Sequence, residues 1–260
     1  MRIQGKVVLI TGASEGIGAA CAAAFRARGA RISVTARSAA KLAEAAGPDG
    51  LAIPGDITDA AVRRAVVDGT IKRFGRIDVL VNNAGRGFYH PACQAPVEDA
   101  ERLFALNVFA PLDLARLVVP RMREQGGGAI VNVSSIAGRI ALPWMTIYSA
   151  SKFALGALTD GLRLELAGTG IRTMTVCPGY VRTAFHANAD GRPPAKVVAA
   201  KRFAITAEEC ASAIVRGVER GARTVVVPRT GWLLIALARL LPRVMDSRLA
   251  AMNQSIWTSD

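Results

Sequence analysis

The sequence predicts an α/β fold, a doubly wound and mostly parallel sheet of seven strands with helices on both faces. Three observations lead to this prediction. Short apolar runs alternate with helical patterns along the chain, a glycine-rich turn follows the first apolar run, and 51% of the 260 residues are hydrophobic. Alternating strands and helices favour parallel pairing with right-handed crossovers. A chain of this size and composition can bury a substantial core in one domain.

The expected strands are short and apolar, and the expected helices lie between them. The strands are Lys6–Thr11, Arg31–Ala36, Leu51–Ile53, Val79–Asn82, Ala129–Ser134, Arg172–Cys177 and Thr224–Pro228. The helices are an Ala-rich run to about Arg28, then Ala39–Ala46, Asp59–Phe74, Val97–Glu124, Tyr148–Ala167 and Ala207–Arg220. We expect one domain over residues 1–230 and an apolar helical extension over residues 231–260. Ligands of such sheets bind at the carboxyl ends of the strands, so we expect the site there.

A candidate phosphate-binding loop lies between the first strand and the first helix. Its residues are Gly12, Ser14, Gly16, Ile17 and Gly18. Glycines let the backbone turn tightly and approach a phosphate, and the free amides of a helix N-terminus favour an anion. Between a strand and a helix this pattern indicates a site for the pyrophosphate of a dinucleotide. A tight turn with no ligand is the alternative.

A hydroxyl, a phenol and an ammonium follow the fifth strand at Ser135, Tyr148 and Lys152. Tyr148 and Lys152 are four residues apart and share one face of a helix. We expect the ammonium to favour the ionised phenol and to lower the pKa of Tyr148, which would make it a general acid and base. A Tyr-x-x-x-Lys pair alone proves little, because a packed tyrosine and a solvated lysine give the same pattern.

Several motifs follow one another along the chain in a characteristic order and spacing. They are Thr11-Gly12-x-x-x-Gly16-Ile17-Gly18, Asn82-Asn83-Ala84-Gly85, Asn107, Ser135, Tyr148-x-x-x-Lys152 and Pro178-Gly179-x-Val181-x-Thr183. Over roughly residues 4–230 this order and spacing resemble the single-domain type of the short-chain dehydrogenase/reductase family. The resemblance implies a Rossmann-type fold and an NAD(P)-binding catalytic domain in residues 1–230.

The resemblance also implies roles for individual residues. The catalytic set is Asn107, Ser135, Tyr148 and Lys152, in which Asn107 helps to hold a water that connects Lys152 to solvent. Ser135 matches the family spacing to Tyr148 and is preferred to Ser134. The cofactor is implied to contact Asn83, Ala84, Gly85, Tyr148, Lys152, Pro178, Gly179, Val181 and Thr183, the last two at the nicotinamide carboxamide.

Arg37, just after the second strand, favours NADP as the cofactor, with NAD as the alternative. An arginine can pair with the 2′-phosphate, whereas an acidic residue would bond the ribose hydroxyl of NAD. Glu15 in the glycine loop departs from NADP-preferring relatives and could repel the phosphate. Asp56 resembles the adenine-contacting aspartate of the family, with Ile57 beside it. As an isolated residue Asp56 could equally cap the helix that starts near Asp59.

Composition limits the other function classes. The formal net charge is +13, but the arginines are scattered and no basic block is interleaved with aromatics, so we expect no nucleic-acid partner. The four cysteines form no C-x-x-C pair and the two histidines lack metal-ligand spacing, so we expect reduced thiols and no metal. Met1–Thr11 lacks the apolar core of a secretory signal, and we expect a cytoplasmic protein.

Two later segments have no fixed reading from sequence. Ala184–Arg202 is polar with little periodicity and resembles a loop that covers a site. Gly231–Leu241 is apolar nearly all round and about half as long as a bilayer-spanning helix. It is interpreted as a core or subunit-interface helix, as a wall of a hydrophobic pocket, or as an anchor on a membrane surface flanked by Arg229, Arg239 and Arg243.

The sequence therefore predicts an NADP(H)-dependent oxidoreductase that interconverts a carbonyl and a primary or secondary alcohol on a fairly hydrophobic small molecule. In the reduction, Tyr148 would give a proton to the carbonyl oxygen, Ser135 would bond that oxygen, and Lys152 would hold the nicotinamide ribose. The alternatives are a non-catalytic cofactor-binding regulator or scaffold and a membrane-surface binding protein. By resemblance we expect a homodimer or homotetramer formed by the helices that hold Asn107 and Tyr148.

Overall fold

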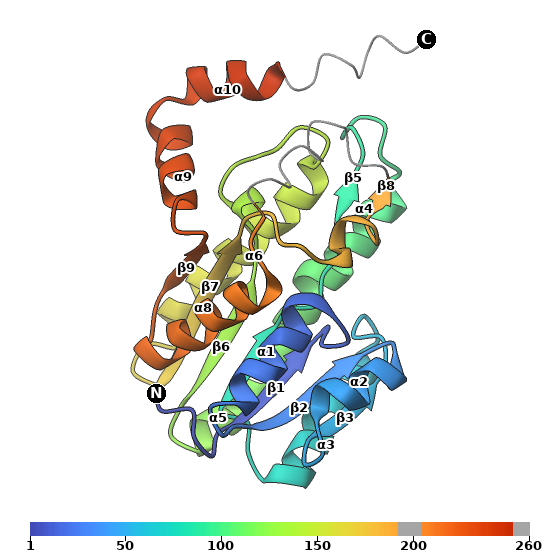
Figure 1. Ribbon diagram of the computed structural model, residues 1–260, viewed down its shortest axis with the longest axis vertical. Helices are drawn as coiled ribbons and strands as arrows, with labels where there is room; N and C mark the ends of the chain where they lie inside the picture. The colour runs from blue at the N-terminus through green and yellow to red at the C-terminus, as the bar shows by residue number, and fades with distance from the viewer. Residues whose placement is uncertain (192–203, 252–260) are drawn as a thin grey trace.

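The computed structural model describes residues 1–191 and 204–251 and has a central sheet between two layers of helices (Figure 1). The seven strands of this sheet are parallel, in the order β3-β2-β1-β4-β6-β7-β9. They are β1 (Val7–Thr11), β2 (Arg31–Ala36), β3 (Leu51–Pro54), β4 (Val79–Asn82), β6 (Gly128–Val133), β7 (Ile171–Pro178) and β9 (Thr224–Val227). The predicted sheet is confirmed, and its strand order reverses between β1 and β4, where such folds bind ligands.

Helices cover both faces of the sheet because each has an apolar side to bury. One layer holds α1 (Gly16–Arg26), α2 (Ala39–Ala46) and α8 (Ala207–Arg220), and the other holds α3 (Ala60–Phe74), α5 (Ala110–Glu124) and α6 (Thr146–Glu165). Phe25, Leu42 and Ile214 are buried in the first layer. Val66 and Leu114 are buried in the second. The central strands β1, β4 and β6 are buried along their whole length, as expected of a parallel sheet that is covered on both faces.

Side-chain caps mark where the helices α3 and α8 begin. Thr206 and Glu209 form a capping box at the start of α8, and the helix ends at the left-handed Gly221. Asp59 caps α3 by accepting a hydrogen bond from the Ala61 amide at 2.8 Å. The alternative cap at Asp56 is therefore wrong. The Asp56 carboxylate instead accepts bonds from the Thr58 amide and hydroxyl.

The predicted helix Val97–Glu124 is interrupted. It consists of α4 (Val97–Phe104), a π-helical turn (Ala105–Phe109) and α5. The run is long and apolar enough to cross a membrane by length and composition alone. Leu114 and Val118, however, pack against the sheet as in a core helix.

A two-stranded parallel ladder lies outside the main sheet. It pairs β5 (Phe88–Tyr89) with β8 (Asp190–Gly191). The predicted loop Ala184–Arg202 therefore contains a helical turn, Ala184–His186, and a short strand. Its remainder from residue 192 lies outside the described residues.

Two helices follow the last strand. α9 (Gly231–Leu240) continues from β9, and α10 (Pro242–Ala250) then turns across the top of the view in Figure 1. Only Gly231 and Ile235 of α9 are buried. Ile235 packs with Ile140, Cys177 and Val226 on the body of the protein. The rest of α9 contributes little to the core.

Candidate active site

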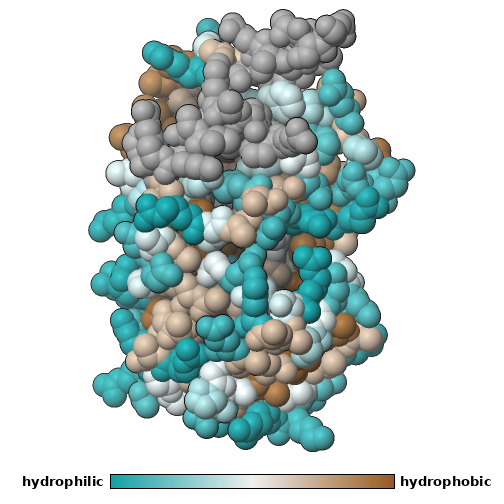
Figure 2. Space-filling model, turned by 45° about the vertical axis from the view of Figure 1, so that its right-hand side comes forward, coloured by the Kyte–Doolittle hydropathy of each residue, from teal (hydrophilic) through white to brown (hydrophobic). Residues whose placement is uncertain are grey.

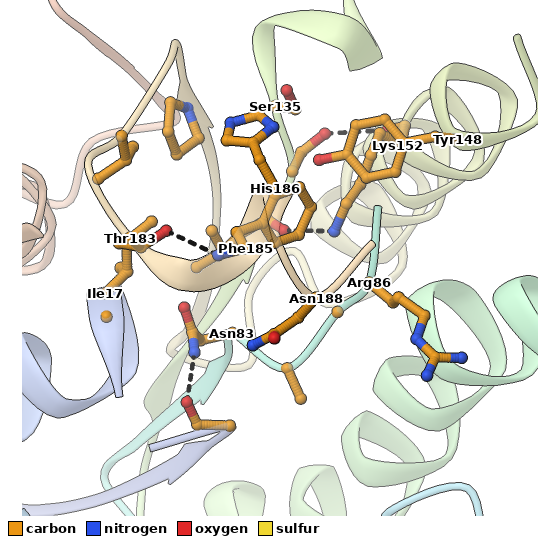
Figure 3. Close-up of a pocket in the computed structure, with 18 of the residues that line it drawn as sticks. Ile17, Asn83, Arg86, Ser135, Tyr148, Lys152, Thr183, Phe185, His186 and Asn188 are labelled. Atoms are coloured by element: carbon orange, nitrogen blue, oxygen red, sulfur yellow. Dashed lines mark hydrogen bonds between the residues drawn. The ribbon is translucent and has the colours of Figure 1, made fainter. Parts of the chain in front are cut away.

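The predicted site residues gather around one cavity at the carboxyl ends of the strands, with a volume of about 1170 Å³. Among the predicted residues, all but Gly18 and Asn107 line it. Figure 3 shows Ser135, Tyr148 and Lys152 grouped on one side of the cavity, and Ile17 and Asn83 on another. Motifs that lie more than a hundred residues apart in the chain thus form one site.

The glycine loop is held by the turn after β4. The Thr11 hydroxyl accepts hydrogen bonds from the amides of Asn83 and Ala84, both at 3.1 Å. Asn83 Nδ2 donates to the carbonyl oxygens of Thr11 and Gly12, both at 3.0 Å. Gly12 has φ +64°, and a Cβ there would lie 2.7 Å from the Ala84 Cα. A Cβ at Gly18 would lie 2.2 Å from the Gly12 carbonyl oxygen. Larger residues cannot fit at these two positions.

The start of α1 fits the pyrophosphate of a dinucleotide. Glu15 precedes the helix and makes no side-chain hydrogen bond to the first-turn amides. Gly16 and Ile17 of this turn line the cavity. First-turn amides lack partners within the helix and carry partial positive charge, so they suit an anion. The residues present therefore fit the pyrophosphate of a dinucleotide.

A cluster of charges lies at the end of β2. Arg37, Ser38 and Lys41 line the cavity. Lys41 Nζ lies 3.2 Å from a Glu15 carboxylate oxygen, and Asn188 Nδ2 donates to the other oxygen at 3.0 Å. Glu15, which could repel a phosphate, is thus paired with a cation. Lys41 was missed from sequence because it lies on a helix of ordinary composition.

The catalytic candidates come from β6 and α6. The Ser135 hydroxyl accepts a bond from the Ala137 amide at 3.0 Å, which fixes its position after the strand. The Tyr148 side chain is 4% exposed and its ring packs 5.8 Å from that of Phe185. Lys152 is 3% exposed, and its Nζ donates to the Val133 carbonyl oxygen at 3.0 Å. Three groups able to donate or accept a proton therefore face one cavity.

Ser134 has a structural role that differs from that of Ser135. Its hydroxyl donates to the Lys152 carbonyl oxygen at 3.0 Å and is buried. It therefore ties α6 to the end of β6. This contact supports the choice of Ser135 as the residue available to a substrate.

Burial controls the protonation of the pair on α6. It raises the pKa of Tyr148 to about 12, although a hydrogen bond with Ser135 acts in the opposite direction. It also lowers the pKa of Lys152 from 10.5 to about 8, since a charged ammonium is poorly solvated there. Burial therefore dominates the pKa of Tyr148, and the lowering of this pKa by Lys152 stays a prediction. Loss of water around each group is the largest cause of both pKa shifts.

Asn107 lies in the π-helical turn and is fully buried. Its Oδ1 accepts from the Arg86 amide at 3.0 Å, and its Nδ2 donates to the Arg86 carbonyl oxygen and to Ser151 Oγ. A Cβ on Gly85 would lie 3.1 Å from Asn107 Oδ1 and 3.2 Å from Lys152 Nζ. Asn107 thus locks the turn after β4 against the helix that carries Lys152.

Several cavity residues were not expected from the sequence. Trp144 has the left-handed φ of +64°, and its buried Nε1 has no hydrogen-bond partner among residues 1–191 and 204–251. A bulky residue in this conformation is strained, and such strain clusters at ligand sites. His186 stacks on Tyr180 with ring centroids 4.1 Å apart and bonds to the Tyr89 hydroxyl. The one signal in the sequence is that Trp144 lies close to Tyr148 and His186 lies close to Thr183.

Known proteins share both the sequence pattern and the fold of this chain. Residues 6–193 match the family model for short chain dehydrogenases. The D-threitol dehydrogenase of Mycolicibacterium smegmatis is 40% identical over 223 residues, which cover 82% of this chain and 86% of that protein. A short-chain dehydrogenase/reductase structure from Burkholderia phymatum in complex with NAD has a TM-score of 0.84 and 25% identity, covering 94% of this chain and 96% of that one. A short-chain dehydrogenase from Burkholderia cenocepacia J2315 in complex with NADP has a TM-score of 0.82 and 31% identity, covering 96% and 99%.

Proposed function

Because this chain belongs to the short-chain dehydrogenase/reductase family, whose members act on CH–OH groups with a nicotinamide cofactor, we propose that it is an NADP(H)-dependent enzyme for a hydrophobic carbonyl compound and its alcohol. One observation carries the proposal. Ser135, Tyr148 and Lys152 line the same cavity as the glycine loop. A substrate can therefore meet the proton donor and the cofactor together.

The proposed chemistry divides between the cofactor and the chain. When bound, the nicotinamide supplies or accepts the hydride. Tyr148 holds a proton at its phenol oxygen through neutral pH, because its pKa is raised to about 12. It can therefore act as a general acid toward a carbonyl oxygen. Ser135 Oγ lies beside it and orients that oxygen by a hydrogen bond.

Lys152 supplies a buried positive charge. With a pKa of about 8, its ammonium is mostly charged at neutral pH. The bond to the Val133 carbonyl uses one of its three hydrogens, so two remain for ribose hydroxyls. The ammonium also stabilises the phenolate that remains after Tyr148 has given up its proton.

The preference for NADP(H) rests on the charges at the end of β2. Arg37 and Lys41 both line the cavity there. A 2′-phosphate carries more than one negative charge and several acceptor oxygens, whereas NAD offers only a hydroxyl. Glu15 is held by Lys41 and Asn188, which reduces its repulsion of a phosphate. We therefore expect a preference of modest size.

The walls on the substrate side favour an apolar molecule. They include Leu103, Leu142, Met145, Trp144, Phe185 and Leu234. Apolar walls favour apolar ligands, and a few polar groups fix their orientation. The Trp144 Nε1–H, which has no partner in the described part of the chain, is one such group, because it can donate to an acceptor oxygen of the substrate.

The outer faces of α5 and α6 carry exposed apolar side chains, among them Phe109, Leu112 and Phe153. Phe109 precedes α5 by one residue. We place the subunit contact of a homodimer on these faces, since grouped exposed apolar residues are typical of interfaces. A cytoplasmic location is part of the proposal.

A substrate screen tests the function. NADPH oxidation is followed with a panel of ketones, aldehydes, steroids and fatty acyl derivatives, with Tyr148→Phe protein as the matched control. We expect turnover with apolar carbonyls that the control lacks. No turnover with any carbonyl, in protein that binds NADPH, would contradict the proposal and favour a non-catalytic binding role.

A further inference from the structure

The helices α9 and α10 form an arm with an exposed apolar surface. We call residues 229–251 the C-terminal arm. Its exposed large apolar side chains are Trp232, Leu233, Leu234, Leu237, Leu240, Leu241 and Val244. In Figure 2 hydrophobic surface is visible at the upper left, at the height of α9 and α10 in Figure 1. Grouped apolar exposure of this kind marks a contact surface.

The same arm is strongly basic. Arg229, Arg239, Arg243 and Arg248 are exposed, whereas Asp246 is its one acidic residue. Within residues 1–191 and 204–251 none of these arginines forms an ion pair with a carboxylate. Their charge is therefore available to an anionic partner. Two copies of this arm would instead oppose like charges.

The arm is also a wall of the active-site cavity. Gly231 and Leu234 of α9 and Leu249 of α10 line that cavity. Ile235 fixes α9 on the body by packing against Ile140 and Val226. Whatever covers the outer side of the arm thus lies next to the substrate side of the cavity.

We propose that the C-terminal arm lies in the surface of an anionic phospholipid bilayer, and that the active site takes its apolar substrate from that bilayer. α9 has ten residues. At about 1.5 Å per residue it reaches roughly 15 Å, too short for a hydrocarbon core of about 30 Å. A short helix with leucines, a tryptophan and flanking arginines suits the interface plane. The delivery of substrate rests on the proposed function, whereas the membrane contact does not.

Vesicle binding tests the contact with the full chain. Phosphatidylcholine vesicles, with and without phosphatidylglycerol, are sedimented with wild type, Leu240→Glu and the control Val97→Glu. Leu240 is 77% exposed on the arm, and Val97 is 67% exposed on α4. Both changes add one negative charge at a solvated position, so both variants should fold.

We expect binding to the anionic vesicles, weakened about tenfold or more by Leu240→Glu and unchanged by Val97→Glu, since burying a leucine in an apolar phase contributes about a factor of ten. Arg239→Gln with Arg243→Gln should weaken binding to the anionic vesicles only, and added salt should do the same. Equal binding of wild type and Leu240→Glu would overturn the proposal. So would a change of molar mass in light scattering by Leu240→Glu without a change in vesicle binding, because the arm would then be a subunit interface.

Activity separates the two parts of the proposal. If wild type binds anionic vesicles but oxidises NADPH with no carbonyl, the proposed function fails and the membrane contact stands. If the enzyme is active, an apolar carbonyl dissolved in anionic vesicles should be reduced more slowly by Leu240→Glu than by wild type. A soluble carbonyl should be reduced equally by both. Equal rates for both substrates would overturn the delivery of substrate from the bilayer.

Discussion

Lys152 Nζ lies 5.8 Å from the centre of the Tyr148 ring and donates its hydrogen bond to the Val133 carbonyl oxygen. The ammonium is thus anchored at the end of β6, at some distance from the phenol. Burial then keeps the phenol protonated through neutral pH and brings the lysine pKa down to about 8. The two residues form a proton donor beside a titratable charge, and the following predictions depend on this arrangement.

Tyr148→Phe removes the phenol proton and keeps the ring. Turnover of a carbonyl substrate should fall by about 100-fold or more, because general acids contribute factors of this size. NADPH affinity, measured by fluorescence titration, should change little. Turnover close to wild type would remove Tyr148 from the proton transfer.

Lys152→Met should leave only a small residual activity and should stabilise the fold. A pKa lowered from 10.5 to about 8 means that burying the charge costs about 3 kcal/mol. The variant also loses the hydrogen bond to the Val133 carbonyl, which costs about 1 kcal/mol. Its free energy of unfolding should therefore rise by about 2 kcal/mol at neutral pH. The cost is present in full below the folded pKa of about 8 and is relieved as pH rises toward 10.5, the unfolded value. Urea unfolding on both sides of pH 8 should show the gain shrinking as pH rises; a gain independent of pH would contradict this reading.

The pH dependence of the wild-type activity should show the ionisation of Lys152. As pH rises through about 8, Lys152 loses its charge while Tyr148 keeps its proton. The kcat/KM for reduction should therefore fall above about pH 8, since this ratio reports groups of the free enzyme. The residual activity of Lys152→Met should lack that fall. If kcat/KM of the Lys152→Met variant still falls above about pH 8, the fall belongs to another group.

Arg37→Ala should weaken NADPH binding by about tenfold and leave NADH nearly unchanged. A charge-assisted bond contributes about 1.5 to 3 kcal/mol, and exposure and salt favour the lower end. Arg64→Ala on α3 is the control, because Arg64 is exposed and does not line the cavity. Dissociation constants for both cofactors at one salt concentration decide the matter. Equal losses for NADH and NADPH would show that Arg37 does not bind the phosphate.

Glu15 and Lys41 give a second test of the phosphate site. Their side chains lie 3.2 Å apart, so the carboxylate competes with a phosphate for the lysine. Lys41→Ala should weaken NADPH binding, and Glu15→Lys should increase the preference for NADPH over NADH. The same titrations measure both variants. If neither variant changes the ratio of NADPH to NADH affinity, Lys41 and Glu15 do not act on the phosphate and only Arg37 remains as its partner.

Trp144→Phe tests the unpartnered indole N–H. Phe keeps an aromatic wall but has no donor, so the KM for a substrate with a second acceptor oxygen should rise severalfold. NADPH affinity should stay constant. A substrate without that oxygen is the control, and an equal rise of KM for both would make Trp144 a packing residue only.

The parts of the fold that depend on local pattern were predictable from sequence. Apolar runs such as Val7–Thr11 and a glycine loop before α1 define strand, turn and helix within a few residues. Parallel strands bring their carboxyl ends to one edge, so the sequence alone predicts that Ser135 and Gly12 belong to one site. Spacing alone placed Tyr148 and Lys152 on one face of α6.

The parts that depend on tertiary contacts were not predictable. The Asn107 side chain, in the π-helical turn, bonds to Arg86 and Ser151, which are distant in sequence. The raised pKa of Tyr148 follows from its burial, which no pattern measures. The exposure of Leu240 likewise depends on where α9 leaves the body.

Transfer of deuterium from NADPH labelled at its hydride position tests the central claim most directly. With an apolar ketone from the screen, the alcohol should carry the label on its carbinol carbon, one per NADPH oxidised. Tyr148→Phe protein with normal NADPH affinity should form that product at least about 100-fold more slowly. Labelled product formed equally fast by the variant, or NADPH oxidation without labelled alcohol, would contradict the account.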